Sequence, residues 1–316
     1  MGSGTYNASA TRHLLSATRR AGGSVMGYTA AVNSGVVEAK VNSKLDPSKK
    51  NRDGIIIRES RDSEQHPNSV PVAVIFDTTG SMMNIPEIFI NQLPNLMELI
   101  IKQKYLADPQ VLFGAVNDAT TDPYAALEIG QFESGNQMDD VLTNILLQGG
   151  GGGSNQESYE LAMYFMARHT SMDSFEKRKK KGYLFIIGDE TPYNYVSKDE
   201  VKRWIGEDIQ DNIPTKDILK ELQAKFNVFW LFPGTAQNGD DKGIQNQLKE
   251  LFGQRFMLLK DPEDICTAIA ATVAISEGRD PHVVVRELQE GLKDKKVTDA
   301  VQAVVDGIPP RNLDEL

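Results

Sequence analysis

The chain has 316 residues, of which 40% are hydrophobic and 25% are charged, an ordinary composition for a globular protein. Its formal net charge of −10 argues against a general nucleic-acid binder, because neutralising phosphates needs clustered Lys and Arg. The single cysteine, Cys266, excludes an internal disulfide framework and a cysteine-based zinc site, and no apolar run approaches the ~18–20 residues of a membrane span.

Residues 1–69 are predicted to form an N-terminal arm or linker that is partly extended. This segment is rich in Gly, Ser, Asn and Lys, and residues 42–69 have the composition of a charged connector. We expect it to become ordered only with help from the rest of the chain. The N-terminus lacks the continuous apolar stretch of a signal peptide, which indicates a cytoplasmic protein, or a virion-associated one if the chain is viral.

From residue 70 onward the chain alternates strands and helices, a pattern typical of an α/β sheet. Strands are predicted at 70–77, 110–118, 126–132, 181–189, 227–234 and 255–260. Helices are predicted at 85–106 with an interruption at Pro94, and at 136–148, 157–170, 197–208, 215–226, 243–253 and 261–278. The order predicts a doubly wound, mostly parallel six-stranded sheet with helices on both faces, in which 126–132 is an antiparallel edge strand. This domain covers 70–278, and residues 279–316 add a helical C-terminal tail.

Oxygen-bearing side chains follow several of the predicted strands. Ligands of such a sheet bind outside the carboxyl ends of its strands, near the point where the strand order reverses. Asp77, Thr79 and Ser81 follow the first strand as D-x-T-x-S, and Asp189 ends the strand 181–189. The loop after the glycine run 149–153 supplies three further oxygen donors, which are Ser154, Asn155 and Glu157. Hard divalent cations prefer such ligands. A simpler interpretation stays open, in which the hydroxyls only cap the next helix and the glycines form a flexible loop.

Three of these stretches, "VAVIFDTTGSM", "GGGGGSNQES" and "YLFIIGDE", resemble the von Willebrand factor A domain with its metal-ion-dependent adhesion site. The resemblance covers about residues 70–278. It implies that Asp77, Thr79 and Ser81 are the first-loop ligands and that Asp189 is the third-loop aspartate. The family commonly has Thr in the middle loop; here Ser154 is the predicted ligand, with Asn155 or Glu157 as substitutes. The implied ion is Mg²⁺, with Mn²⁺ or Ca²⁺ as alternatives.

Two further carboxylates, Asp118 and Asp122, lie in the loop after the second predicted strand. They either border the metal site or only shape a turn.

The same resemblance implies a metal-dependent protein-interaction module, acting as an intracellular adaptor or assembly component. An acidic side chain of the partner would complete the coordination sphere, and the implied partners are a MoxR-type AAA+ ATPase or assembly subunits, with no nucleic acid and no membrane. The alternative is a structural subunit of a viral or cellular assembly built on the same fold.

An enzyme is not expected. A haloacid-dehalogenase-like Mg²⁺-dependent phosphatase carries D-x-D-G-T at this place, whereas Thr79 replaces the second Asp and removes the general acid/base. A metal-dependent hydrolase stays open, but no catalytic base or nucleophile constellation is visible.

Overall fold

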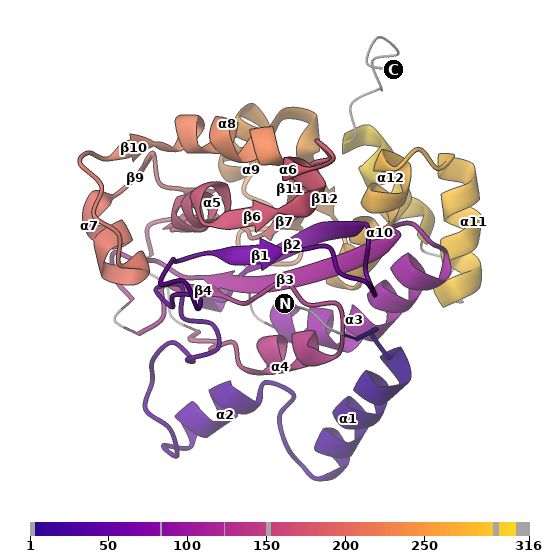
Figure 1. Cartoon of the computed structure of the whole chain (residues 1–316), viewed down its shortest axis with the longest axis horizontal. Helices are drawn as coiled ribbons and strands as arrows, with labels where there is room; N and C mark the ends of the chain where they lie inside the picture. Colours follow the sequence, from indigo (N-terminus) through magenta and orange to yellow (C-terminus); the bar gives the residue numbers. More distant parts are fainter. Residues whose placement is uncertain (1–3, 83, 123, 150–152, 293–296, 308–316) are drawn as a thin grey trace.

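One central sheet organises the rest of the chain (Figure 1). The computed structural model describes residues 4–82, 84–122, 124–149, 153–292 and 297–307. The sheet has six strands in the order β12-β11-β7-β2-β3-β4, with β3 and β4 antiparallel and every other neighbouring pair parallel. The predicted mostly parallel sheet with one antiparallel edge strand is therefore confirmed. Its strands are β2 (Ser69–Asp77), β3 (Asp108–Val116), β4 (Leu127–Ile129), β7 (Gly182–Ile187), β11 (Phe226–Pro233) and β12 (Phe256–Leu259).

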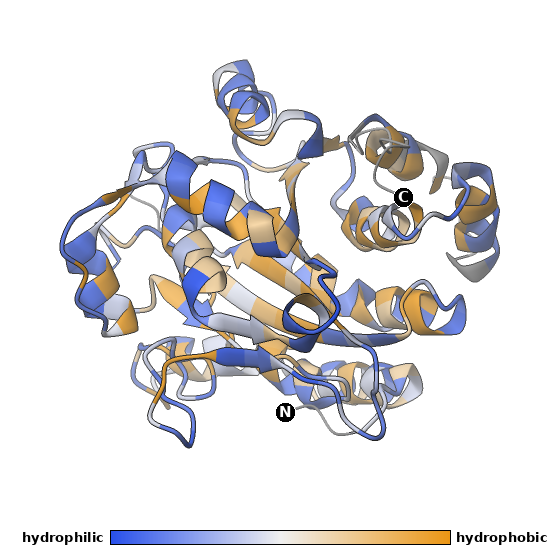
Figure 2. Cartoon of the chain, turned by 45° about the horizontal axis from the view of Figure 1, so that its top comes forward, coloured by the Kyte–Doolittle hydropathy of each residue, from blue (hydrophilic) through white to orange (hydrophobic). Residues whose placement is uncertain are grey.

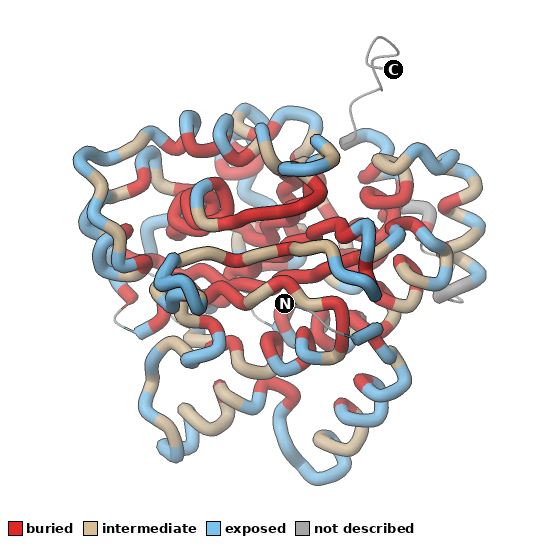
Figure 3. The backbone as a smooth tube through the Cα atoms, in the orientation of Figure 1, coloured by how far each residue is buried: buried red, intermediate tan, exposed pale blue. Residues whose placement is uncertain are grey.

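The strands are apolar on both sides because helices cover both faces of the sheet. All nine residues of β2 are buried, and its side chains alternate between two apolar clusters. Val72, Val74 and Phe76 point into one cluster, while Ala73 and Ile75 point into the other. Figure 2 shows the apolar colour concentrated in the sheet and on the inner sides of the helices, and Figure 3 shows the same segments as buried.

The helices divide between these two faces. On the Val74 side lie α1 (Ala8–Arg20), α3 (Ile85–Lys102), α4 (Gln137–Thr143), α10 (Ile265–Ser276), α11 (Pro281–Leu292) and α12 (Val297–Gly307). On the Ile75 side lie α5 (Tyr159–Arg168), α8 (Thr215–Lys225) and α9 (Lys242–Phe252). The tail helices α11 and α12 pack against α10 and contribute Val284, Leu288, Val301 and Val304 to the first cluster.

Several helix predictions were wrong in detail; the predicted helix 136–148, for example, ends at Thr143. Helix α3 runs through Pro94 without interruption, because buried neighbours such as Phe89, Leu93 and Met97 hold it against the sheet although proline cannot donate to the helix ladder. The predicted helix 197–208 is shorter, since α7 (Lys198–Glu200) continues as one π-helical turn, η2 (Val201–Ile205). Its start is as predicted, with the Ser197 hydroxyl accepting from the Glu200 N–H at 3.5 Å.

The remaining elements are short and connect or border the sheet. They are α2 (Gly27–Asn33), β1 (Arg58–Ser60), η1 (Gly80–Met82), β5 (Gln156–Glu157), β6 (Thr170–Met172), α6 (Asp173–Glu176), β8 (Thr191–Pro192), β9 (Tyr195–Val196), β10 (Ile213–Pro214), η3 (Gly253–Arg255) and η4 (Pro262–Asp264).

The N-terminal segment lies against the β4 edge of the sheet. The Ile129 N–H of β4 donates to the Leu45 carbonyl at 2.7 Å, and β1 pairs in parallel with β6. Buried Arg58 donates to the carbonyls of Asp46 and Gly130, at 2.7 and 3.0 Å. The arm therefore covers an edge strand that would otherwise expose unpaired backbone groups.

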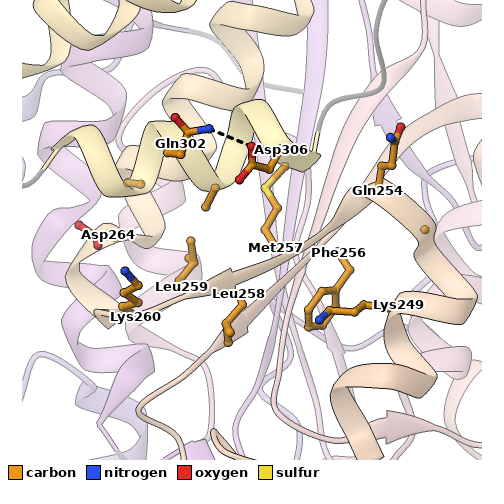
Figure 4. Close-up of a pocket in the computed structure, with 13 residues that line it drawn as sticks. Lys249, Gln254, Phe256, Met257, Leu258, Leu259, Lys260, Asp264, Gln302 and Asp306 are labelled. Atoms are coloured by element: carbon orange, nitrogen blue, oxygen red, sulfur yellow. Dashed lines mark hydrogen bonds between the residues drawn. The ribbon is translucent and has the colours of Figure 1, made fainter. Parts of the chain in front are cut away.

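A cavity of about 470 Å³ lies at the opposite edge, between β12 and α12 (Figure 4). Met257 and Leu259 of β12 and Gln302 and Asp306 of α12 line it. No predicted site residue borders this cavity. In the described part of the chain, no helix is both long and apolar enough to cross a membrane.

Candidate functional site

The site lies where the strand order reverses. The chain passes from β2 to β3 and β4 on one side, and then returns to place β7 on the other side of β2. Asp77 is the last residue of β2, and Asp189 follows the end of β7 by two residues. Because β2 and β7 are parallel neighbours, both carboxylates reach the same edge of the sheet at its switch point.

Four oxygen-bearing residues lie in close succession at this point. The Asp77 Oδ1 atom accepts from the Thr79 N–H at 2.8 Å and from the Thr79 hydroxyl at 2.6 Å. The hydroxyl oxygens of Thr79 and Ser81 lie 3.1 Å apart, and Ser81 donates to Asp189 Oδ1 at 2.7 Å. The turn that follows β2 is thus folded by its own aspartate, and the Ser81 hydroxyl of this turn reaches the Asp189 carboxylate.

Other groups hold the second oxygen of each carboxylate. The Tyr159 hydroxyl of α5 donates to Asp77 Oδ2 at 2.5 Å, and the Asn238 N–H donates to Asp189 Oδ2 at 3.0 Å. The Gln237 N–H also donates to the Ser81 carbonyl at 3.0 Å. The loop after β11 therefore belongs to the site. Sequence reasoning missed this loop and Tyr159, because backbone donors and a helix tyrosine carry no motif.

Ser154, the predicted middle-loop ligand, makes its contacts elsewhere. Its hydroxyl is exposed, donates to the Gln156 carbonyl at 3.1 Å and lies 3.5 Å from the Tyr193 hydroxyl. Those contacts do not join it to Asp77, Thr79, Ser81 or Asp189, and its role as a ligand stays a prediction.

The neighbouring residues of interest also have local partners. The Asn155 carbonyl accepts from the Thr191 N–H at 3.2 Å. Asp118 and Asp122 shape turns: Asp118 accepts from the Thr120 N–H at 2.9 Å, and Asp122 accepts from the Tyr124 N–H at 2.7 Å.

Glu157 is the middle-loop residue that reaches the other carboxyl groups. It is only 1% exposed, and the short parallel pair β5–β8 sets it opposite Pro192. The charges of Asp77 and Glu190 act on its carboxyl, and its Oε2 atom is buried without a hydrogen-bond partner. Sequence reasoning named Glu157 only as a substitute, and it did not include Glu190.

Electrostatically the site is a cluster of buried carboxyl groups whose charged forms are disfavoured. Burial raises the pKa of Asp77 to about 7, and the Asp189 charge adds to this, while hydrogen bonds from Thr79 and Tyr159 lower it. Burial, followed by the charge of Asp77, raises the pKa of Glu157 to about 11. Burial likewise raises the pKa of Glu190. Among the described residues, the principal influences on these three pKa values include neither Lys nor Arg.

The residues present suit a hard divalent cation. Two carboxylates and two hydroxyls provide oxygen ligands, and the unpartnered Oε2 of Glu157 is a further buried acceptor. Within the described ranges, no three His, Cys, Asp or Glu side chains converge closely enough to hold a metal by themselves. A site here would therefore depend on hydroxyl and water ligands beside the carboxylates.

Comparisons with known proteins add only distant likenesses. No protein-family profile and no curated protein matches the chain. The pilus adhesin SpaC from Lactobacillus rhamnosus GG, in its open conformation, aligns with 72% of this chain and 31% of its own, at 12% identity and a TM-score of 0.43. Proximal thread matrix protein 1 from the mussel byssus aligns with 66% of this chain and 46% of its own, at 10% identity and a TM-score of 0.42. This chain spans less than half the length of either structure.

Proposed function

We propose that this chain is a protein-interaction module of the von Willebrand factor A type, whose Asp77, Thr79, Ser81 and Asp189 hold a divalent cation, Mg²⁺ first of all. The observation that carries the proposal is the unbroken chain of oxygens from Asp77 Oδ1 to Asp189 Oδ1 at the switch point. Buried carboxylates are costly unless a cation compensates their charge, and a bound ion would supply that compensation.

A cation held in this way supplies a Lewis acid with positions left for oxygen atoms from outside the chain. An acidic side chain of a partner protein would occupy one of these positions. The chain's own residues orient the ligands: Thr79 fixes Oδ1 of Asp77, and Ser81 ties the first loop to Asp189. The protein would thus act as a metal-dependent adaptor or assembly component, with a MoxR-type AAA+ ATPase or assembly subunits as the class of partner to test.

The middle-loop ligand is better assigned to Glu157 than to Ser154. Glu157 is buried beside Asp77 and Glu190, whereas the Ser154 hydroxyl is exposed and bonded to its own loop. We expect Glu157→Gln to weaken Mg²⁺ binding at least ~10-fold, as loss of groups around a metal commonly does. Ser154→Ala should leave the affinity unchanged, and the reverse pattern would return the assignment to Ser154.

The direct test is titration calorimetry of Mg²⁺ and Mn²⁺ into metal-stripped protein. Wild type should bind about one ion per chain, and the isosteric Asp77→Asn should abolish binding while keeping the fold. Asp280→Asn is a matched control, since Asp280 accepts from the His282 N–H at 2.9 Å at the start of α11 and Asn caps a helix equally well. A wild type that binds neither ion would remove the basis of the proposal.

The partner contact is tested separately by capture on immobilised protein. A partner that uses a carboxylate on the metal should bind in Mg²⁺, be released by a chelator, and fail to bind Asp77→Asn. Capture that is equal in Mg²⁺ and chelator would contradict the metal-dependent contact while leaving metal binding itself intact.

A further inference from the structure

The two carboxylates at the switch point have the same asymmetry. In Asp77, Oδ1 accepts from the Thr79 hydroxyl and Oδ2 accepts from the Tyr159 hydroxyl. In Asp189, Oδ1 faces Ser81 and Oδ2 accepts from the Asn238 N–H. Each carboxylate therefore directs one oxygen toward the Thr79 and Ser81 hydroxyls. Its other oxygen accepts a hydrogen bond from elsewhere in the fold.

Close packing fixes the Tyr159 hydroxyl in this position. The Tyr159 ring lies edge-on to Trp230, with 4.6 Å between ring centroids, and the Trp230 Nε1–H donates to the Gly188 carbonyl at 3.0 Å. Gly188 leaves the space that the hydroxyl fills, because a Cβ atom at that residue would lie 2.0 Å from the Tyr159 hydroxyl oxygen. Tyr159 is fully buried, so its hydroxyl has no room to turn away from Asp77.

We propose that Tyr159 is a specificity-determining positioning residue. Its hydrogen bond occupies Oδ2 of Asp77, so that this oxygen does not bind the ion and the site selects Mg²⁺ and Mn²⁺ over Ca²⁺. This inference rests on the proposed cation site and adds the basis of its ion preference. The Tyr159 hydroxyl donates to Asp77, so it would act on a bound ion through that carboxylate.

The coordination habits of the ions explain the selection. Ca²⁺ takes ~6–8 oxygen ligands and often binds carboxylates through both oxygens, whereas Mg²⁺ takes six in an octahedron and keeps several waters. A site limited to one oxygen from Asp77 and one from Asp189 suits the smaller octahedral ion. Freeing Oδ2 of Asp77 would let that carboxylate bind through both oxygens, which favours Ca²⁺ more than Mg²⁺.

The test compares Tyr159→Phe with Tyr164→Phe, which removes the same atom from the same helix. The Tyr164 hydroxyl donates to Glu207 at 2.6 Å, and Glu207 also lies 2.8 Å from His169 Nε2. Calorimetric affinities for Mg²⁺ and Ca²⁺ are measured for wild type and both variants, with the thermal unfolding of each metal-free protein as the check of folding.

We expect wild type to bind Mg²⁺ at least ~10-fold more tightly than Ca²⁺, and Tyr159→Phe to lower that ratio about 10-fold, the usual scale for groups around a metal. Tyr164→Phe should keep the wild-type ratio. A merely structural role for Tyr159 would weaken both ions equally and leave the ratio unchanged, which would overturn the inference.

The wild-type measurement can overturn the inference even if Tyr159→Phe does not fold. A wild type that binds Ca²⁺ as tightly as Mg²⁺ overturns the selectivity and leaves the cation site standing. A wild type that binds neither ion overturns the cation site, and the present inference with it.

Discussion

Replacing Glu128 by Gln should stabilise the protein in alkaline solution and leave its stability nearly unchanged in mild acid. Glu128 lies on β4 with no exposed surface, and its Oε2 accepts from the Leu146 N–H at 3.0 Å. Its Oε1 atom is buried without a partner. Burial raises the pKa of Glu128 to about 8 and the charge of Asp122 adds to this, while hydrogen bonds from the backbone of Leu146 and Asn42 lower it.

The sign and size of the effect follow from proton linkage. Because the folded-state pKa is raised from 4.5 to about 8, the folded protein keeps a proton that the unfolded chain has already released. The stability due to this proton is complete below pH 4.5 and is lost as the pH rises toward 8. The loss proceeds at about 1.4 kcal/mol per pH unit, which sets a ceiling of roughly 5 kcal/mol over this window.

The assay is denaturant unfolding of metal-free protein at pH 5, 7 and 9. Gln reproduces the neutral acid, so wild type and Glu128→Gln should agree to within about 1 kcal/mol at pH 5, and the variant should be more stable by a few kcal/mol at pH 9. Glu250→Gln is the control, because Glu250 is exposed and its ion pair with Lys216 is long, at 3.9 Å. If the stabilities of wild type and Glu128→Gln fall in parallel with pH, the buried ionisation of Glu128 is refuted.

Three further substitutions test other parts of the fold. Gly188→Ala should lower the free energy of unfolding in urea by about 1–3 kcal/mol and weaken Mg²⁺ binding, because the new Cβ would lie 2.0 Å from the Tyr159 hydroxyl oxygen. The control Gly27→Ala places no atom within 4 Å of its new Cβ and should change neither quantity. Arg58→Met should lower the free energy of unfolding by roughly 2–4 kcal/mol and speed proteolysis of the N-terminal arm, because the carbonyls of Asp46 and Gly130 would lose their donor. An unchanged cleavage rate would show that Arg58 does not hold the arm. Asp241 caps α9 by accepting from the Gly243 and Ile244 N–H groups, so Asp241→Ala should destabilise the protein by ~1 kcal/mol in thermal unfolding whereas Asp241→Asn should not. Equal losses in the two variants would contradict the capping role.

The strands and the first site loop could be read from the residues because their causes are local. A run such as Val70–Phe76 is apolar at every position, as only a strand covered on both faces requires. Asp77, Thr79 and Ser81 meet because the aspartate folds the next few residues through its own side chain. Asp189 joins them because parallel neighbouring strands end at one edge of the sheet.

The middle loop of the site was harder to predict from the sequence, because tertiary contacts decide its conformation. After a run of glycines the loop conformation has no local determinant, and the pairing of Gln156 and Glu157 with β8 decides which side chain turns inward. The continuity of α3 through Pro94 likewise depends on packing that outweighs a local preference.

By itself, the sequence determined the α/β alternation, the order of strands and helices and the residues that carry oxygen at the ends of β2 and β7. Hydrophobic periodicity and turn chemistry act over a few residues, and they are written directly in the chain. Only the tertiary structure decided the strand order around β2, the inward position of Glu157, and the donors from Tyr159 and Asn238 that occupy one oxygen of each carboxylate. Those contacts join residues up to 82 positions apart, and only close packing of the folded chain brings them together.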